Sequence, residues 1–188
     1  MSTALRRGTH VHDLRHRYSV ELRPDEQLDA DLRRVAHELE ARGILLEGAC
    51  TAARFHPHAT LLNAGVPGIA AADNAAATLA PGAAVVQFDE VGTFGHGRIV
   101  YVRPSDASAL LTAREAAIAA LDPDELDPLV HARPWTAHVT LAYAVPEGSR
   151  EVALDHVRAA LPIVGRWGGV QVWDLDVRPT VLLHRAAL

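Results

Sequence analysis

The sequence contains no lysine, so all 18 of its basic residues are arginines. A chain without a lysine amine cannot form a Schiff base, the lysine–nucleotide intermediate of ATP-dependent ligases, or a phosphate-binding loop of the GKS/T type. Its single cysteine, Cys50, cannot form an internal disulfide, and the surrounding GACTAA shows no metal-ligand pattern. We interpret Cys50 as a small packed residue.

Long apolar runs are also missing. No stretch approaches the about 20 apolar residues that cross a bilayer, and the N-terminal MSTALRRGTHVHDLRHR lacks the apolar centre of a secretory signal. We therefore expect a cytoplasmic protein without membrane contact. We also expect a monomer, although no sequence pattern determines the oligomeric state. The length and the 49% hydrophobic content predict one domain over 18–188, with 1–17 as an N-terminal arm that need not be folded. Because the net charge is −5, we expect any nucleic-acid substrate to be held at its end.

A histidine and a threonine interrupt the apolar run FHPHATLL, residues 55–62. In an extended strand, residues i and i+2 point to the same face, so His58 and Thr60 emerge side by side while Ala59 and Leu61 face the other way. The strand then has an apolar face and a face that could carry chemistry. Taken alone, the pattern also fits a hydrogen-bonded structural histidine.

The same pattern recurs in WTAHVTLAY, where His138 follows His58 by 80 residues and Thr140 follows Thr60 by the same number. The neighbouring elements recur at about this offset. In each half we predict a strand, a helix, the motif strand, a second helix and a closing strand. In the first half, the strands are expected at 18–22 and 85–91, and the helices from Pro24 to Gly43 and over 69–80. In the second half, the strands are expected at 98–102 and 170–177; one helix begins at a cap formed by Ser105 or Asp106, and the other runs from Ser149 to Pro162.

The repeats, 18–91 and 98–177, predict an α+β fold with two lobes. We expect two antiparallel sheets related by an approximate two-fold axis, with outer helices and a central cleft. His58 and Thr60 would then face His138 and Thr140 across that cleft.

The paired motifs HATL (58–61) and HVTL (138–141), their spacing and the duplicated element order resemble the two-histidine (2H) phosphoesterase superfamily. This superfamily includes the bacterial 2′-5′ RNA ligases and cyclic nucleotide phosphodiesterases. The resemblance covers about 18–185, and VGTFGHGRIVYVRP (91–104) is similar to the family's central hairpin. Relatives often place a proline before the second histidine, where this chain has Thr136-Ala137, so the shape of that loop is expected to differ.

The resemblance implies a phosphodiesterase that needs neither metal nor cofactor. Its substrate would be a nucleotide or RNA end with a 2′,3′-cyclic phosphate or a 2′-5′ linkage. One of His58 and His138 would accept a proton from the attacking water and the other would protonate the departing ribose oxygen, because imidazole titrates near neutral pH. Thr60 and Thr140 would donate hydrogen bonds to the phosphate oxygens. The reverse reaction would join RNA ends without ATP, and the sequence leaves open which histidine is the acid.

Three aromatic residues lie near the motifs and are candidates for stacking on a base: Phe94, Trp135 and Tyr143. Each could instead be a packing residue. Tyr143 shares the strand parity of Val139 and Leu141, which turns it away from the motif face, so we rank it below Trp135.

Two other functions stay open at this point. His56 and His58 form an HxH pair that could ligate a metal, as in a metal-dependent hydrolase, although no third ligand falls at an expected spacing. His10, His12 and His16 are interpreted as part of a solvated arm. The second alternative is a module that binds a nucleotide or RNA end without turning it over. GTFGHG (92–97) is expected to be a hairpin turn, and the sequence contains no GxSxG motif of a serine esterase.

Overall fold

A computed structural model describes residues 17–44, 55–79, 84–132, 134–176 and 181–188. Cys50, the histidines of the N-terminal arm and the end of the predicted helix 69–80 lie outside the described residues. The elements, in chain order, are β1 (Tyr18–Pro24), α1 (Glu26–Glu40), β2 (Ala59–Ala64), α2 (Ile69–Thr78), β3 (Val85–Phe88), β4 (Glu90–Phe94), β5 (Ile99–Arg103), α3 (Ser108–Ile118), α4 (Leu129–Ala132), β6 (Val139–Ala142), α5 (Arg150–Ala160), β7 (Ile163–Asp174) and β8 (Val181–Ala187).

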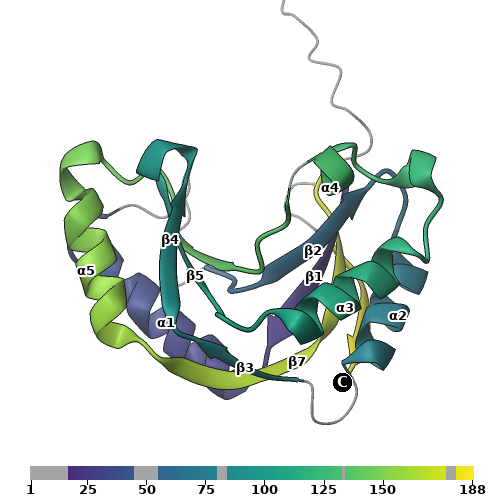
Figure 1. Ribbon diagram of the computed structural model, residues 1–188, viewed down its shortest axis with the longest axis horizontal. Helices are drawn as coiled ribbons and strands as arrows, with labels where there is room; N and C mark the ends of the chain where they lie inside the picture. The colour runs from purple at the N-terminus through teal and green to yellow at the C-terminus, as the bar shows by residue number, and fades with distance from the viewer. Residues whose placement is uncertain (1–16, 45–54, 80–83, 133, 177–180) are drawn as a thin grey trace, which may run out of the picture.

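The strands form two antiparallel sheets, which confirms the predicted α+β class (Figure 1). The larger sheet has the order β2-β1-β7-β3, with β8 also paired to β7, and the smaller has the order β4-β5-β6. The hairpin expected over 91–104 is formed by β4 and β5, joined by a short turn at Gly95–Gly97. No helix among the described residues is both long and apolar enough to cross a membrane.

The two sheets do not coincide with the two sequence repeats. The closing strand of the second half, β7, pairs with β1 of the first half, whereas β4 of the first half pairs with β5 of the second. The helices follow the same exchange, because α1 packs against α5 and β6, and α3 packs against α2 and β2. In Figure 1, α1 and α5 accordingly lie on the left, and α2 and α3 on the right. Each lobe therefore contains elements from both halves of the chain.

The helix boundaries are set by local caps that differ slightly from the sequence expectation. Helix α1 begins after Asp25 rather than at Pro24, because Pro24 still pairs with β7 and the Asp25 carboxylate accepts the N–H of Leu28. Helix α3 begins at Ser108, so its N-cap is Ala107 and not the expected Ser105 or Asp106, although the Asp106 carboxylate accepts the N–H of Ser108. The closing strand expected over 85–91 is divided at Asp89 into β3 and β4. The strand β8 was not predicted.

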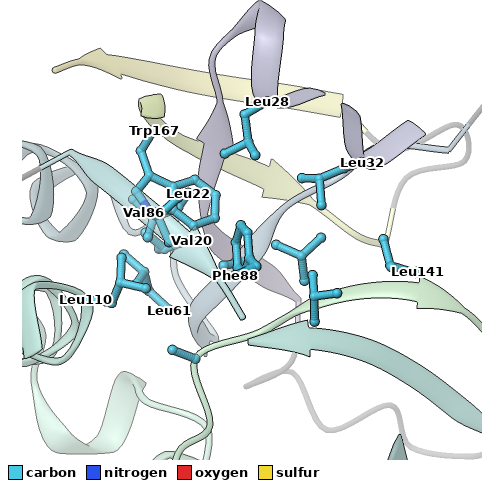
Figure 2. Close-up of a cluster of buried hydrophobic side chains, with 14 of the residues drawn as sticks. Val20, Leu22, Leu28, Leu32, Leu61, Val86, Phe88, Leu110, Leu141 and Trp167 are labelled. Carbon is cyan, nitrogen blue, oxygen red and sulfur yellow. The ribbon is translucent and has the colours of Figure 1, made fainter. Parts of the chain in front are cut away.

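One hydrophobic core joins both sheets and the helices (Figure 2). The apolar stripe predicted for α1 is buried in it. Phe88 of β3 and Trp167 of β7 meet edge to face near its centre, with ring centroids 6.1 Å apart. Figure 2 labels ten of its members: Val20, Leu22, Leu28, Leu32, Leu61, Val86, Phe88, Leu110, Leu141 and Trp167. The core fixes the two motif strands relative to each other.

Candidate functional site

The two motif strands carry the same irregularity at the same place. In the β1–β2 pair, Thr60 lies opposite Glu21 and the register shifts at the next residue, so Leu61 is the extra residue of a bulge. In the β5–β6 pair, Thr140 lies opposite Tyr101 and the register shifts in the same way. Bulges turn neighbouring side chains to new directions and are common beside active sites. The sequence repeat is therefore also a repeat of backbone geometry around each threonine.

Both motif histidines are fixed in the same ring orientation. The Nδ1 atom of His58 lies 2.8 Å from the carbonyl oxygen of His56, and that of His138 lies 2.7 Å from the carbonyl oxygen of Thr136. A carbonyl only accepts hydrogen bonds, so each Nδ1 carries the proton. The Nε2 atom is then a free base in the neutral ring and a proton donor in the charged ring. Each histidine is thus built to exchange a proton at Nε2.

Aromatic rings enclose His138. The centroid of its ring lies 4.9 Å from that of Phe94 and 5.2 Å from that of Tyr101, both edge to face. Burial lowers the pKa of the His138 imidazole; the hydrogen bond to Thr136 opposes this, and charge on His58 lowers the pKa further. The environment favours neutral His138, and the two motif histidines lie within electrostatic range of each other.

Gly92 makes room for this aromatic wall. It lies opposite Tyr101 in the β4–β5 pair, and a Cβ atom at this position would come within 2.4 Å of the Tyr101 Cζ and Oη atoms. The Tyr101 ring then stacks on Phe94, with centroids 4.2 Å apart. Phe94 therefore packs against His138 and Tyr101, and its expected contact with substrate stays a prediction.

His58 has a polar environment instead. Its Nε2 atom lies 3.7 Å from Oε1 of Glu21, a residue that is only 5% exposed. The buried Gln171 Nε2 lies 3.3 Å from the other Glu21 oxygen and 2.6 Å from Nε2 of His56. Burial, reinforced by charge on His58, lowers the pKa of His56. His56 is therefore held neutral as an acceptor for the Gln171 amide. Neither Glu21 nor Gln171 was predicted from the sequence.

A cavity of about 410 Å³ connects the two motifs. Thr60 of the first motif and His138 of the second both line it, together with Leu61, Leu62, Asn63, Arg114, Asp127, Leu129, Val130 and Trp135. Its volume is in the range of small-ligand sites. The mixture of apolar and polar walls suits a flat ring with hydrogen-bonding edges.

Trp135 bridges the motifs within this cavity. Its Nε1–H donates to the carbonyl oxygen of Thr60 over 3.1 Å. The Arg114 guanidinium lies over the Trp135 ring at 5.3 Å and donates to the carbonyl oxygens of Leu61 and Val130. Burial lowers the pKa of Arg114, but an arginine stays charged at any ordinary pH. No sequence pattern pointed to Arg114, which comes from an outer helix, α3.

The remaining candidates lie elsewhere. His58 and Phe94 are not among the described residues that line this cavity. Thr140, half-buried on β6, and Tyr143, half-buried just after that strand, do not line it either. The cavity therefore brings together Thr60, Trp135 and His138 of the predicted site residues. Within the described ranges, no three His, Cys, Asp or Glu side chains are grouped so that they could hold a metal ion.

Comparisons with known proteins identify the family and the fold of the chain. A family model described as the 2′-5′ RNA ligase superfamily matches residues 24–179. LigT of E. coli in complex with NADP⁺ superposes with a TM-score of 0.57 at 15% identity, covering 93% of this chain and 98% of LigT. LigT in complex with 3′-AMP gives a TM-score of 0.52 at 18% identity with the same coverage. No curated protein sequence matches. At these identities, the likeness to LigT is one of fold.

Proposed function

The chain belongs to the 2′-5′ RNA ligase superfamily, and from this premise we propose that it is a phosphodiesterase that uses two histidines and no metal. The proposed substrate is a nucleotide or RNA end with a 2′,3′-cyclic phosphate or a 2′-5′ linkage. The observation that carries the proposal is the matched pair of histidines, each with Nδ1 bound to a backbone carbonyl and Nε2 left for proton transfer. Their common orientation beside matching bulges supports a shared chemical role.

In the proposed reaction, a water molecule attacks the phosphorus of the cyclic phosphate. A neutral histidine takes the water proton at Nε2 while the P–O bond to the ribose oxygen breaks, and the protonated histidine gives its Nε2 proton to that oxygen. Thr60 and Thr140 donate hydrogen bonds to the non-bridging oxygens, where negative charge must be held. Attack by a 5′-hydroxyl in place of water, with the P–O bond to the ribose 3′-oxygen breaking, would join two ends through a 2′-5′ linkage. This ligation is the reverse of the cleavage of a 2′-5′ linkage to a cyclic phosphate.

The cavity beside Thr60 and His138 is the proposed place of the nucleoside. The structures of LigT with 3′-AMP and NADP⁺ support a nucleotide as the kind of ligand for this fold. A monomeric state stays a prediction. A cytoplasmic location stays a prediction.

The direct test is incubation of the protein with 2′,3′-cyclic mononucleotides and 2′-5′ linked dinucleotides, followed by mass spectrometry, with and without a chelator. We expect a cyclic substrate to gain one water and become a monophosphate at an unchanged rate in the chelator. Binding without turnover would replace the proposal by the nucleotide-binding module. Activity that disappears with the chelator and returns with added metal would replace it by the metal-dependent hydrolase.

Replacement of Trp135 tests the place of the base. If the indole stacks on the base, Trp135→Ala should raise KM by about 10-fold, because base–aromatic stacking contributes about 1–3 kcal/mol per base. Trp135→Phe keeps an aromatic face but loses the hydrogen bond to Thr60, and should restore most of the affinity. Steady-state kinetics on the cyclic substrate measure both variants. Equal loss in the two variants would assign Trp135 to the bridge between motifs and not to base binding.

A further inference from the structure

The two halves of the site differ at one equivalent pair of residues. Glu21 faces Thr60 across β1 and β2, and Tyr101 faces Thr140 across β5 and β6, each beside the same bulge. Tyr101 follows Glu21 by 80 residues, the offset that also separates the motif histidines. A carboxylate therefore accompanies His58 where an aromatic ring accompanies His138. In an otherwise repeated site, this difference breaks the symmetry between the two histidines.

Glu21 is held in place for an interaction with His58. Gln171 of β7 is fully buried and binds one Glu21 oxygen, while the other oxygen lies 3.7 Å from His58 Nε2. Among the described residues, this is the only ion pair that Glu21 makes. A buried carboxylate without a positive partner is costly, and the position of Glu21 beside His58 Nε2 suits an interaction with a charged imidazolium.

Among the residues that the structure describes, no carboxylate forms an ion pair with His138. The groups that face it from the neighbouring strands are the rings of Phe94 and Tyr101, and burial among them favours the neutral imidazole. The titratable groups that face His58 are Glu21 from β1, His56 from the same loop, and His138 from the other motif. His56 accepts the Gln171 amide at Nε2 and is therefore neutral. Glu21 is then the one group in this set whose charge could favour a proton on His58.

We propose that Glu21 is a positioning residue that holds His58 in its protonated form, so that His58 is the proton donor of the reaction and His138 is the proton acceptor. The inference rests on the proposed two-histidine function. It places the attacking water at His138 Nε2 and the departing ribose oxygen at His58 Nε2. After each turnover His138 holds the water proton and His58 is neutral, and exchange with solvent restores both. The bound substrate therefore has one productive direction in a nearly symmetric site.

The pH profile of Glu21→Gln tests this assignment. With one histidine neutral and the other charged, kcat/KM of the native enzyme should be bell-shaped between about pH 5 and 8. The acidic limb reports the acceptor and the alkaline limb the donor. A carboxylate favours the charged imidazolium, so its removal should move the alkaline limb to lower pH and lower kcat/KM by up to about 10-fold above the optimum. The acidic limb should stay in place.

The side chain of Gln has the size of Glu and can keep the contact with Gln171, and thermal unfolding checks that the variant folds. A matched control is Glu38→Gln, which removes another carboxylate–histidine pair, that of Glu38 with His156 at 2.9 Å. This control should leave both limbs unchanged. A shift of the acidic limb in Glu21→Gln would make His58 the acceptor, and unchanged limbs would make Glu21 merely structural; either result overturns the proposal.

A second measurement does not depend on turnover. NMR of the ring C–H resonances follows the protonation of His58 and His138 in the free protein, each assigned with its own alanine variant. We expect His58 to lose its proton at lower pH in Glu21→Gln than in the native protein, while His138 moves little. If no tested substrate is turned over, the proposed function fails, yet this titration still decides whether Glu21 holds the proton on His58. Unchanged His58 resonances would overturn the inference even in an active enzyme.

Discussion

Alanine in place of either His58 or His138 is expected to lower turnover of a 2′,3′-cyclic nucleotide by about 10²-fold or more, because each variant loses one of the two proton-transfer groups. Thr60→Val should cost less, since water can partly replace a lost hydroxyl donor. The double histidine variant should fall less than the product of the two single losses, because the acid and the base act in one step. Single-turnover kinetics separate these effects from substrate binding.

The matched control is His37→Ala on α1, where the histidine side chain is 71% exposed and far from both motifs in the sequence. It should leave turnover unchanged. Circular dichroism should show native folding in all of these variants, because His58 and His138 are only half-buried. Equal and mild losses in the histidine and threonine variants would contradict acid–base catalysis and favour a module that only binds nucleotides.

The parts of the fold that could be predicted from the sequence are those determined by local patterns. The spacing of Leu28, Leu32, Val35 and Leu39 predicts one buried helix face, and these residues are buried in α1. The motifs HATL and HVTL predict two equivalent strands and the 2H family, and the family match confirms this resemblance. Such features need only the residues within a few positions of each other.

The exchange of β4 and β7 could not be predicted in this way. A period-two pattern shows that a strand has an apolar face, but it does not show which distant strand pairs with it. The division at Asp89 allows the chain to leave one sheet and enter the other, and the Asp89 carboxylate accepts hydrogen bonds from the backbone N–H and the hydroxyl of Ser105. That Asp89 holds the chain at this division by binding Ser105 becomes visible only when the strand pairing is known.

Glu21 was missed for a related reason. In YSVEL, a glutamate that alternates with apolar residues is typical of the solvent face of a strand. Here that position is buried: Glu21 is only 5% exposed, and Gln171 of β7 and Thr60 of β2 lie beside it on the neighbouring strands. A signal did exist in the sequence: the 80-residue offset aligns Glu21 with Tyr101, and an unlike pair in a repeat is a candidate for a difference in function. That comparison becomes meaningful once both residues are placed beside the motif threonines.

Phe88→Ala is expected to lower the free energy of unfolding by about 3–5 kcal/mol, the usual cost of removing a buried phenylalanine ring. Phe88 is 1% exposed and packs on Trp167 within a core to which both sheets contribute. Natural domains have only about 5–15 kcal/mol of stability, so the variant should be close to unfolding at physiological temperature. Val85→Ala, on the same strand but at a 53% exposed position, is the control and should cost about 1 kcal/mol or less.

Urea unfolding, followed by tryptophan fluorescence and by circular dichroism, measures both changes. Since the exchanged strands and helices give the lobes one continuous core, the two signals should report a single transition that Phe88→Ala moves to lower urea concentration. Phe88 is not among the described residues that line the cavity at Thr60 and His138, so turnover per folded molecule should stay native at low temperature. Two separate transitions would show that the lobes unfold independently, and the strand exchange would then not couple them.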